Sequence, residues 1–183
     1  MPIVPGQSGP RPAWYRRLPP ALQRVAAASD RVPTLPLNAG PSLRALVARL
    51  PSALATGRPG PVQVVAQELA EGICRALGVP PVVVRVERRR PPLHGGELQG
   101  LYEATDRRSR PRVTVWMLTA KRGQVVAYRT FLRTLLHELC HHLDYDLLRL
   151  RDSLHTQGFY QRESSLFHAL DAGRVDAPTS IEG

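Results

Sequence analysis

Residues 137–141 read His-Glu-Leu-Cys-His, with a glutamate directly after the first of two histidines that are four positions apart. Side chains four residues apart lie on the same face of an α-helix, so His137 and His141 can bind one tetrahedral zinc ion. Glu138 is turned about 100° away, where its carboxylate can accept a proton from a zinc-bound water but cannot easily become a third ligand. This layout is typical of zinc peptidases.

Leucines recur along the opposite side of the same segment and predict which face of the helix is buried. On a helical wheel that starts at His137, the stripe contains Leu132, Leu136, Leu139, Leu143, Leu147 and Leu150. Four of the chain's six histidines lie within nineteen positions, namely His137, His141, His142 and His155. We therefore expect an amphipathic helix with a leucine face in the core and a separate histidine face that binds zinc.

A catalytic zinc ion usually has three protein ligands and keeps a fourth position for water, so the two pentad histidines need a partner. His155 follows His141 by fourteen residues, and Glu163 follows it by twenty-two. Asp144 is on the same helical face, but it lies a turn too far along a straight helix to favour the same metal. We expect Asp144 to orient a histidine or to be a solvated charge.

The segment after the helix extends the pattern. His155 opens the run His-Thr-Gln-Gly-Phe-Tyr, in which Gly158 permits a tight backbone path and Phe159 can anchor the loop beneath the metal. The chain here resembles the SprT-like zinc metalloproteases, whose motif is H-E-x-x-H, a loop, a third histidine and a phenylalanine four positions later. The matching residues are His137, Glu138, His141, His155 and Phe159, and the resemblance covers about the last two thirds of the chain.

The resemblance implies zinc-dependent hydrolysis of peptide bonds, with His155 as the third ligand, and some members of that family cut proteins that are crosslinked to DNA. The run Thr-Gln-Gly after His155 departs from the Gly-Pro-Glu type expected in the family. Glu163 keeps a second arrangement open, since a glutamate some twenty residues past the pentad resembles the ligand set of gluzincin-type peptidases. Otherwise we expect Glu163 to be a surface charge or to pair with Arg162.

The expected mechanism follows from these residues. A zinc ion held by His137, His141 and His155 would lower the pKa of its bound water towards ~7 and polarise the scissile carbonyl. Glu138 would accept the water's proton and pass it to the leaving amine. The tetrahedral intermediate needs a further hydrogen-bond donor, and the candidates near in sequence are Tyr145, Tyr160 and Arg162.

Length and composition fit a small enzyme. The 183 residues, of which 43% are hydrophobic, suffice for one domain with tails. Cys74 and Cys140 are expected to be buried and reduced rather than to form a disulfide. The first residues lack the apolar run of a secretory leader, and no segment has the ~20 apolar residues of a membrane span, so we expect a cytoplasmic protein without a membrane partner.

Positive charge is concentrated before the pentad. Residues 1–136 carry 21 Lys and Arg against 7 Asp and Glu, whereas residues 137–183 carry 4 against 8. Two dense groups, Arg88–Arg90 and then Arg107, Arg108, Arg110 and Arg112, have the pattern that binds phosphate backbones, which predicts affinity for nucleic acid. A nucleic-acid-binding module with a structural zinc is the alternative function, although no Cys-x-x-Cys pair is present to close such a site.

The pattern along the chain divides it into three regions. Residues 1–40 are rich in proline and are expected to be a largely disordered, basic segment with a short helix at 21–28. Residues 41–172 are expected to form the zincin-like domain, and residues 173–183 a flexible tail. Helices are predicted at 42–55 and 62–77, the second ended by Gly78 and Pro80.

Three strands are predicted between those helices and the pentad. Val82–Arg88 and Arg112–Leu118 alternate in the manner of strands, and Glu97–Ala104 lies between them after a turn rich in glycine and proline. The fold class is therefore α+β, a minimal zincin-like core of helices on a three-stranded sheet with the H-E-x-x-H helix. By analogy with such peptidases, we expect Arg112–Leu118 to offer its edge to an extended substrate.

Overall fold

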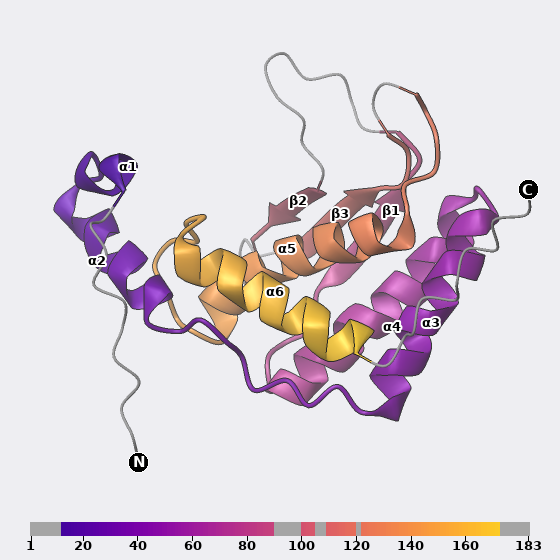
Figure 1. The fold of residues 1–183 in the computed structure, drawn as a ribbon, viewed down its shortest axis with the longest axis horizontal. Coiled ribbons are helices and arrows are strands. Elements are labelled where there is room, and N and C mark those ends of the chain that lie inside the picture. Colours follow the sequence, from indigo (N-terminus) through magenta and orange to yellow (C-terminus); the bar gives the residue numbers. More distant parts are fainter. Residues whose placement is uncertain (1–11, 90–99, 105–108, 120–121, 173–183) are drawn as a thin grey trace, which may run out of the picture.

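The fold is α+β, as the sequence predicts, with six helices and a small mixed sheet in the part of the chain described by the computed structural model (Figure 1). The described residues are 12–89, 100–104, 109–119 and 122–172. The helices are α1 (Ala13–Arg16), α2 (Pro20–Asp30), α3 (Pro41–Ala55), α4 (Pro59–Leu77), α5 (Tyr128–Asp146) and α6 (Gln157–Asp171). The strands are β1 (Val83–Glu87), β2 (Gly100–Glu103) and β3 (Arg112–Trp116).

Helix boundaries follow local chemistry. Proline occupies the first helical position of α2, α3 and α4, where its missing N–H costs nothing. Gly78 ends α4 with φ 70°, a left-handed conformation that favours glycine. The pentad helix α5 ends at Asp146, so the leucine stripe is shorter than predicted, because Leu147 only caps the helix and Leu150 lies beyond it.

The sheet has the order β1-β3-β2, with β1 parallel and β2 antiparallel to β3. The prediction that the strand at 112–118 offers its edge to a substrate is therefore wrong, because β3 is hydrogen-bonded on both sides. The outer strands are β1 and β2. Residues 97–99 of the strand predicted at 97–104 lie outside the described residues, as does the turn before them.

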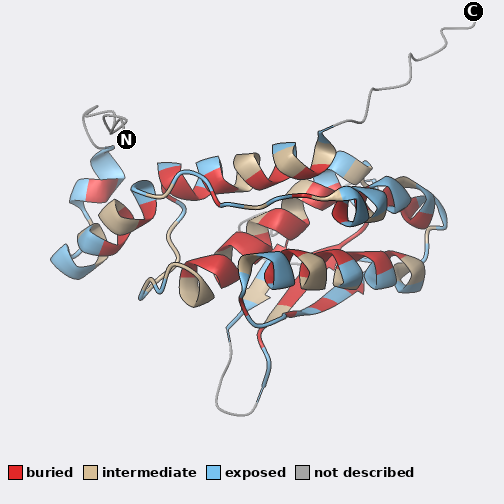
Figure 2. Ribbon diagram, turned by 90° about the horizontal axis from the view of Figure 1, so that it is seen from below, coloured by how far each residue is buried: buried red, intermediate tan, exposed pale blue. Residues whose placement is uncertain are grey.

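The core lies between one face of the sheet and two layers of helices. Helices α4 and α5 pack against the sheet, α3 packs on α4, and α6 packs on α5 (Figures 1 and 2). The core contains alternate valines of β1 and β3 together with the leucines of α5. The core face of α5 is thus opposite His137 and His141, which leaves these two side chains free to line a site, whereas His142 is fully buried.

Residues 12–40 are ordered into structure that packs on the rest of the chain, so the prediction of a largely disordered segment is wrong for them. Helix α2 extends the short helix predicted at 21–28, and the chain from 31 to 40 runs past α6 to α3 (Figure 1). Ala26, Ser29, Leu35 and Ala39 are buried. Proline-rich composition concealed these apolar anchors. Residues 1–11 and the tail at 173–183 lie outside the described residues.

Within the described ranges, no helix is long and apolar enough to cross a membrane. The two cysteines are buried and free, as the sequence predicts, and burial raises the pKa of both thiols.

Candidate metal centre

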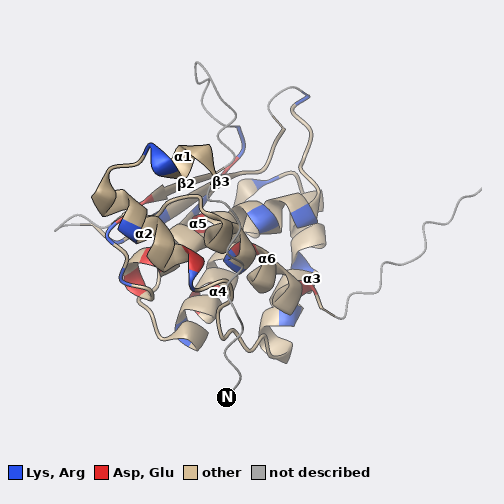
Figure 3. Cartoon of the chain, turned by 60° about the vertical axis from the view of Figure 1, so that its left-hand side comes forward, with Lys and Arg blue, Asp and Glu red and all other residues tan. Residues whose placement is uncertain are grey.

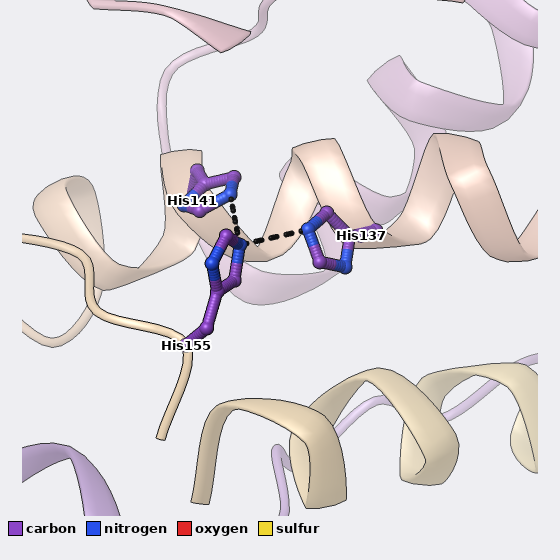
Figure 4. A group of neighbouring side chains, drawn as sticks. All are labelled: His137, His141 and His155. Atoms are coloured by element: carbon purple, nitrogen blue, oxygen red, sulfur yellow. Dashed lines mark hydrogen bonds between the residues drawn. The ribbon is translucent and has the colours of Figure 1, made fainter. Parts of the chain in front are cut away.

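Three imidazole rings from two segments converge on one point. His137 and His141 project from successive turns of α5, and His155 reaches them from the loop before α6 (Figure 4). The Nε2 atom of His155 lies 2.9 Å from that of His137 and 3.2 Å from that of His141. Ligands of a tetrahedral zinc ion are separated by about 3.3 Å, given Zn–N bonds of about 2.05 Å. These three histidines therefore lie close enough to bind one metal ion.

The second nitrogen of His137 is held by a carboxylate. Oε2 of Glu163 lies 3.0 Å from Nδ1 of His137. An ionised carboxylate only accepts hydrogen bonds, so the proton of the neutral ring resides on Nδ1 and the Nε2 lone pair faces the other histidines. Neither expected role of Glu163 is found: it is not a solvated surface charge, and its ion-pair partner is not Arg162.

His141 is oriented by a buried chain of polar groups. Nδ1 of His141 lies 2.7 Å from Oγ of Ser153, whose hydroxyl donates to Oδ2 of Asp144 at 2.8 Å. Because that hydroxyl has given its one proton to Asp144, its oxygen accepts from Nδ1–H of His141. Arg162 donates to the other oxygen of Asp144 at 2.7 Å, and both side chains are fully buried. Asp144 thus orients a histidine through Ser153, as one of its two predicted roles requires.

Phe159 forms the floor of the histidine cluster. Its ring is fully buried and its centroid lies 4.9, 4.8 and 5.0 Å from those of His137, His141 and His155. Thr156 caps α6 by accepting from the Phe159 N–H, which fixes the turn that carries His155. The predicted anchoring role of Phe159 is what this packing provides.

Helix α2 holds the same turn from the other side. The Gly158 N–H donates to Asp30, and Arg162 donates to the Ser29 and Val32 carbonyls. A Cβ atom at Gly158 would lie 2.5 Å from the Ser29 carbonyl oxygen, so only glycine permits this approach. The N-terminal region is therefore part of the support of the site.

Two of the three histidines, His141 and His155, lie where burial favours the neutral ring. Burial, followed by the neighbouring histidines His137 and His155, lowers the pKa of His141 from 6.5 to about 3. Burial and His137 lower the pKa of His155 as well. Metal binding requires the unprotonated Nε2, so these shifts favour the ligand form near neutral pH.

Glu138 lies beside the cluster, at the edge of the sheet. Its side chain is buried against Gly100 of β2, where an added Cβ would come within 2.5 Å of Oε1. Burial raises the pKa of Glu138 to about 7, an effect that His137 and a hydrogen bond from the Tyr102 backbone partly offset. A carboxyl with this pKa can exchange a proton with a reacting group near neutral pH.

The cluster opens into a cavity of about 560 Å³. Its walls are β2 on one side and α5 on the other, with the His155 loop and α6 completing them. The lining residues are Gly100, Leu101, Tyr102, Arg133, Thr134, His137, Glu138, His141, Tyr145, His155 and Glu163. Ser153, Gly100, Tyr102 and Arg133 were not predicted, because only tertiary packing brings them to the pentad.

The three candidates for stabilising a developing oxyanion differ in position. Tyr145 lines the cavity, with its hydroxyl 3.4 Å from Asp152. Tyr160 stacks on His155 and is half-exposed, outside the cavity lining. Arg162 is fully buried and bonded to Asp144 and α2, so it cannot reach a substrate.

The described members of the two arginine groups lie at opposite ends of the paired strands β1 and β3. Arg88 and Arg89 follow β1, whereas Arg110 and Arg112 lie where β3 begins, and the parallel register pairs Arg112 with Val83 at the start of β1. The arginines of the described residues are spread over several helices and strands (Figure 3). Five strand residues, roughly 16 Å, separate the groups. Arg90, Arg107 and Arg108 lie outside the described residues. Binding of nucleic acid stays a prediction.

Comparison with known proteins adds no relative. No family model matches the chain, and neither curated proteins nor solved structures match it. The SprT-like resemblance therefore rests on the five motif residues alone.

Proposed function

We propose that this chain is a zinc-dependent metalloendopeptidase of the SprT-like kind, with His137, His141 and His155 as ligands and Glu138 as general base. The observation that carries the proposal is the convergence of three Nε2 atoms beside a buried glutamate in an open cavity. Histidine nitrogens with fixed tautomers suit zinc well. A structural zinc site would instead be closed by a fourth Cys or His, and Cys140 is buried in the core.

Zinc bound here would act as a Lewis acid and lower the pKa of a coordinated water. The protein's own groups do the rest. Glu163 and the Ser153–Asp144 pair hold the two helix imidazoles, which keeps their Nε2 lone pairs aimed at one point. Glu138 accepts a proton at its carboxylate from the attacking water and returns it to the leaving amine.

The substrate pairs with β2 as an extended strand. The outer edge of β1 is closed, because Gln67 bonds both the Val84 N–H and the Val82 carbonyl and Gln63 bonds the Val86 N–H. Strand β2 has β3 on one side and the cavity on the other. Backbone pairing to such an edge binds peptides with little dependence on their side chains.

The test combines metal analysis with a protease assay on denatured casein. Purified protein should contain one zinc per chain and should cut casein, and Glu138→Gln should keep the zinc while cutting at least about 10²-fold more slowly. Glu68→Gln, which changes an exposed glutamate on α4, is the matched control and should behave as wild type. Undiminished cutting by Glu138→Gln would disprove the mechanism, and a zinc-loaded wild type that cuts nothing would disprove the activity.

A further inference from the structure

One cation lies at an end of the cavity where the proposed chemistry does not use it. Arg133 is on α5 one turn before His137 and lines the cavity with Thr134. Among the described residues that line the cavity, it is the one arginine or lysine. Its side chain is 43% exposed, so its guanidinium is accessible to a bound molecule.

The guanidinium of Arg133 is fixed in place by an aromatic ring. Its central carbon lies 3.9 Å from the centroid of Phe167, which is buried on α6. A cation held over a ring has lost much of its freedom before any ligand arrives, so a further contact costs less entropy. Its planar edge carries donors that match a carboxylate.

The acidic neighbour of Arg133 is committed elsewhere. Oε1 of Glu163 lies 3.8 Å from Nη1 of Arg133, a long contact, while Oε2 of the same group is 3.0 Å from His137. Glu163 therefore leaves much of the hydrogen-bonding capacity of Arg133 unused.

The direction of β2 gives the side of the substrate that meets this cation. Gly100 lies against Glu138, whereas Tyr102, two residues later, stacks on His141 and Tyr145. Strand β2 thus runs in the same direction as α5. A substrate paired antiparallel to β2, the more stable of the two pairings, runs the opposite way and carries its C-terminal side towards Arg133.

We propose that Arg133 binds a substrate carboxylate on the C-terminal side of the scissile bond, within two residues of it. One helical turn of about 5.4 Å separates Arg133 from His137, and an extended residue spans about 3.3 Å, which sets that reach. The carboxylate is either an acidic side chain or the free C-terminus of the peptide. This inference rests on the proposed function of the same site.

Two measurements test the inference. Mass spectrometry first identifies the sites at which denatured casein is cut, and one such site supplies a parent sequence. Internal peptides are then made from it with Glu, Gln or Lys at the first or second position after the cut. Wild type should cleave the best Glu peptide at least about tenfold better in kcat/KM than its Gln partner, as one charge-assisted hydrogen bond allows. Peptides that end at the same positions, as free acid or as amide, separate a terminal carboxylate from a side chain.

Variants assign the preference to the residue. Arg133→Gln should remove the Glu-over-Gln preference while still cleaving the Gln peptide, and Arg133→Glu should favour Lys instead. Arg129→Gln is the matched control, because Arg129 lies one turn before Arg133 on α5 and outside the cavity lining. Arg129→Gln should keep the Glu-over-Gln preference. This result would show that the preference depends on Arg133 and not on the overall positive charge of the protein.

Binding separates the inference from the activity. In zinc-loaded Glu138→Gln, fluorescence anisotropy should show tighter binding of the acidic or free-acid peptide, and adding Arg133→Gln should abolish the difference. Cleavage by wild type with no carboxylate preference, or with a preference that survives Arg133→Gln, would overturn this inference alone. If no casein site is cut, the proposed function fails, and this inference fails with it.

Discussion

Glu163 accepts from Nδ1 of His137, on the side of the ring away from the nitrogen that faces His155. Glu163, the alternative ligand, is instead a hydrogen-bond acceptor for the proposed ligand His137. A carboxylate in this position fixes the ring's orientation and raises the basicity of Nε2. His155 takes the third place in the cluster instead.

This relationship predicts different effects for the two residues. His155→Ala should abolish stoichiometric zinc binding, because it removes a nitrogen of the cluster. Glu163→Gln should retain one zinc per chain but weaken its affinity by about 10- to 100-fold, the usual effect of losing a carboxylate behind a metal-binding histidine. Competition with a chromophoric chelator measures both affinities.

His168→Ala is the matched control for the loss of a histidine, because His168 is exposed on α6 outside the cavity lining. It should bind zinc as wild type does. If Glu163→Gln lost zinc entirely while His155→Ala retained it, the gluzincin-like arrangement would be correct.

The buried pair of Arg162 and Asp144 predicts a large effect on stability. Arg162→Met leaves the Asp144 carboxylate buried without its cation and also removes the bonds to α2, so the free energy of unfolding should fall by about 3–5 kcal/mol. Urea denaturation of the metal-free protein measures the change. The exposed Arg151→Met should alter stability by less than about 0.5 kcal/mol.

A double variant distinguishes the loss of the ion pair from the effect of leaving one charge buried alone. Arg162→Met with Asp144→Leu removes both charges, so part of the lost stability should return. If the double variant lost more unfolding free energy than the two single variants lose together, the uncompensated buried charge would not be the cause of the lost stability.

Much of the site could be predicted because its chemistry is local in sequence. The spacing of His137 and His141 on one helix fixes their common face, and Phe159 follows His155 closely enough for both to belong to one turn. These predictions needed only helical geometry. The fold class followed in the same way from alternating valines and amphipathic segments.

The remainder depends on contacts between distant segments, which single-residue patterns do not reveal. Ser29 and Asp30 reach α6 across more than a hundred residues, and their region was concealed by its prolines. The strand order was likewise hidden, because alternation in Arg112–Trp116 does not indicate which neighbours flank it. The sequence does not indicate why position 100 is a glycine, whereas in the structure the side chain of Glu138 lies against it and leaves no space for a Cβ atom.

Gly100→Ala should damage catalysis without removing zinc. The new Cβ would lie 2.5 Å from Oε1 and 2.6 Å from Cγ of Glu138, so this side chain, the proposed general base, must move. A displacement of about 1 Å can cost about 10²-fold in rate. Gly100→Ala should therefore contain the normal amount of zinc but have a reduced kcat on a casein-derived peptide. Gly60→Ala on α4, where no atom lies within 4 Å, is the control.

The raised pKa of Glu138 predicts how stability varies with pH in metal-free protein. The unfolded chain releases this proton near pH 4.5, but burial holds it in the folded state up to about pH 7. Between these values the folded state binds more protons, so this group makes the protein less stable as pH rises. Glu138→Gln cannot ionise, and its stability relative to wild type should increase over that window by on the order of 2 kcal/mol.

Urea unfolding in the presence of a chelator, at pH 4.5, 5.5, 6.5 and 7.5, measures the difference between the two proteins. His141, whose lowered pKa makes the protein less stable as pH falls from 6.5 towards 3, is present in both and largely cancels. Glu87→Gln reports the effect of changing an exposed carboxyl. If Glu138→Gln and wild type gave parallel curves, Glu138 would ionise alike in the folded and unfolded chain. Burial at the edge of β2 would then not raise the pKa of Glu138.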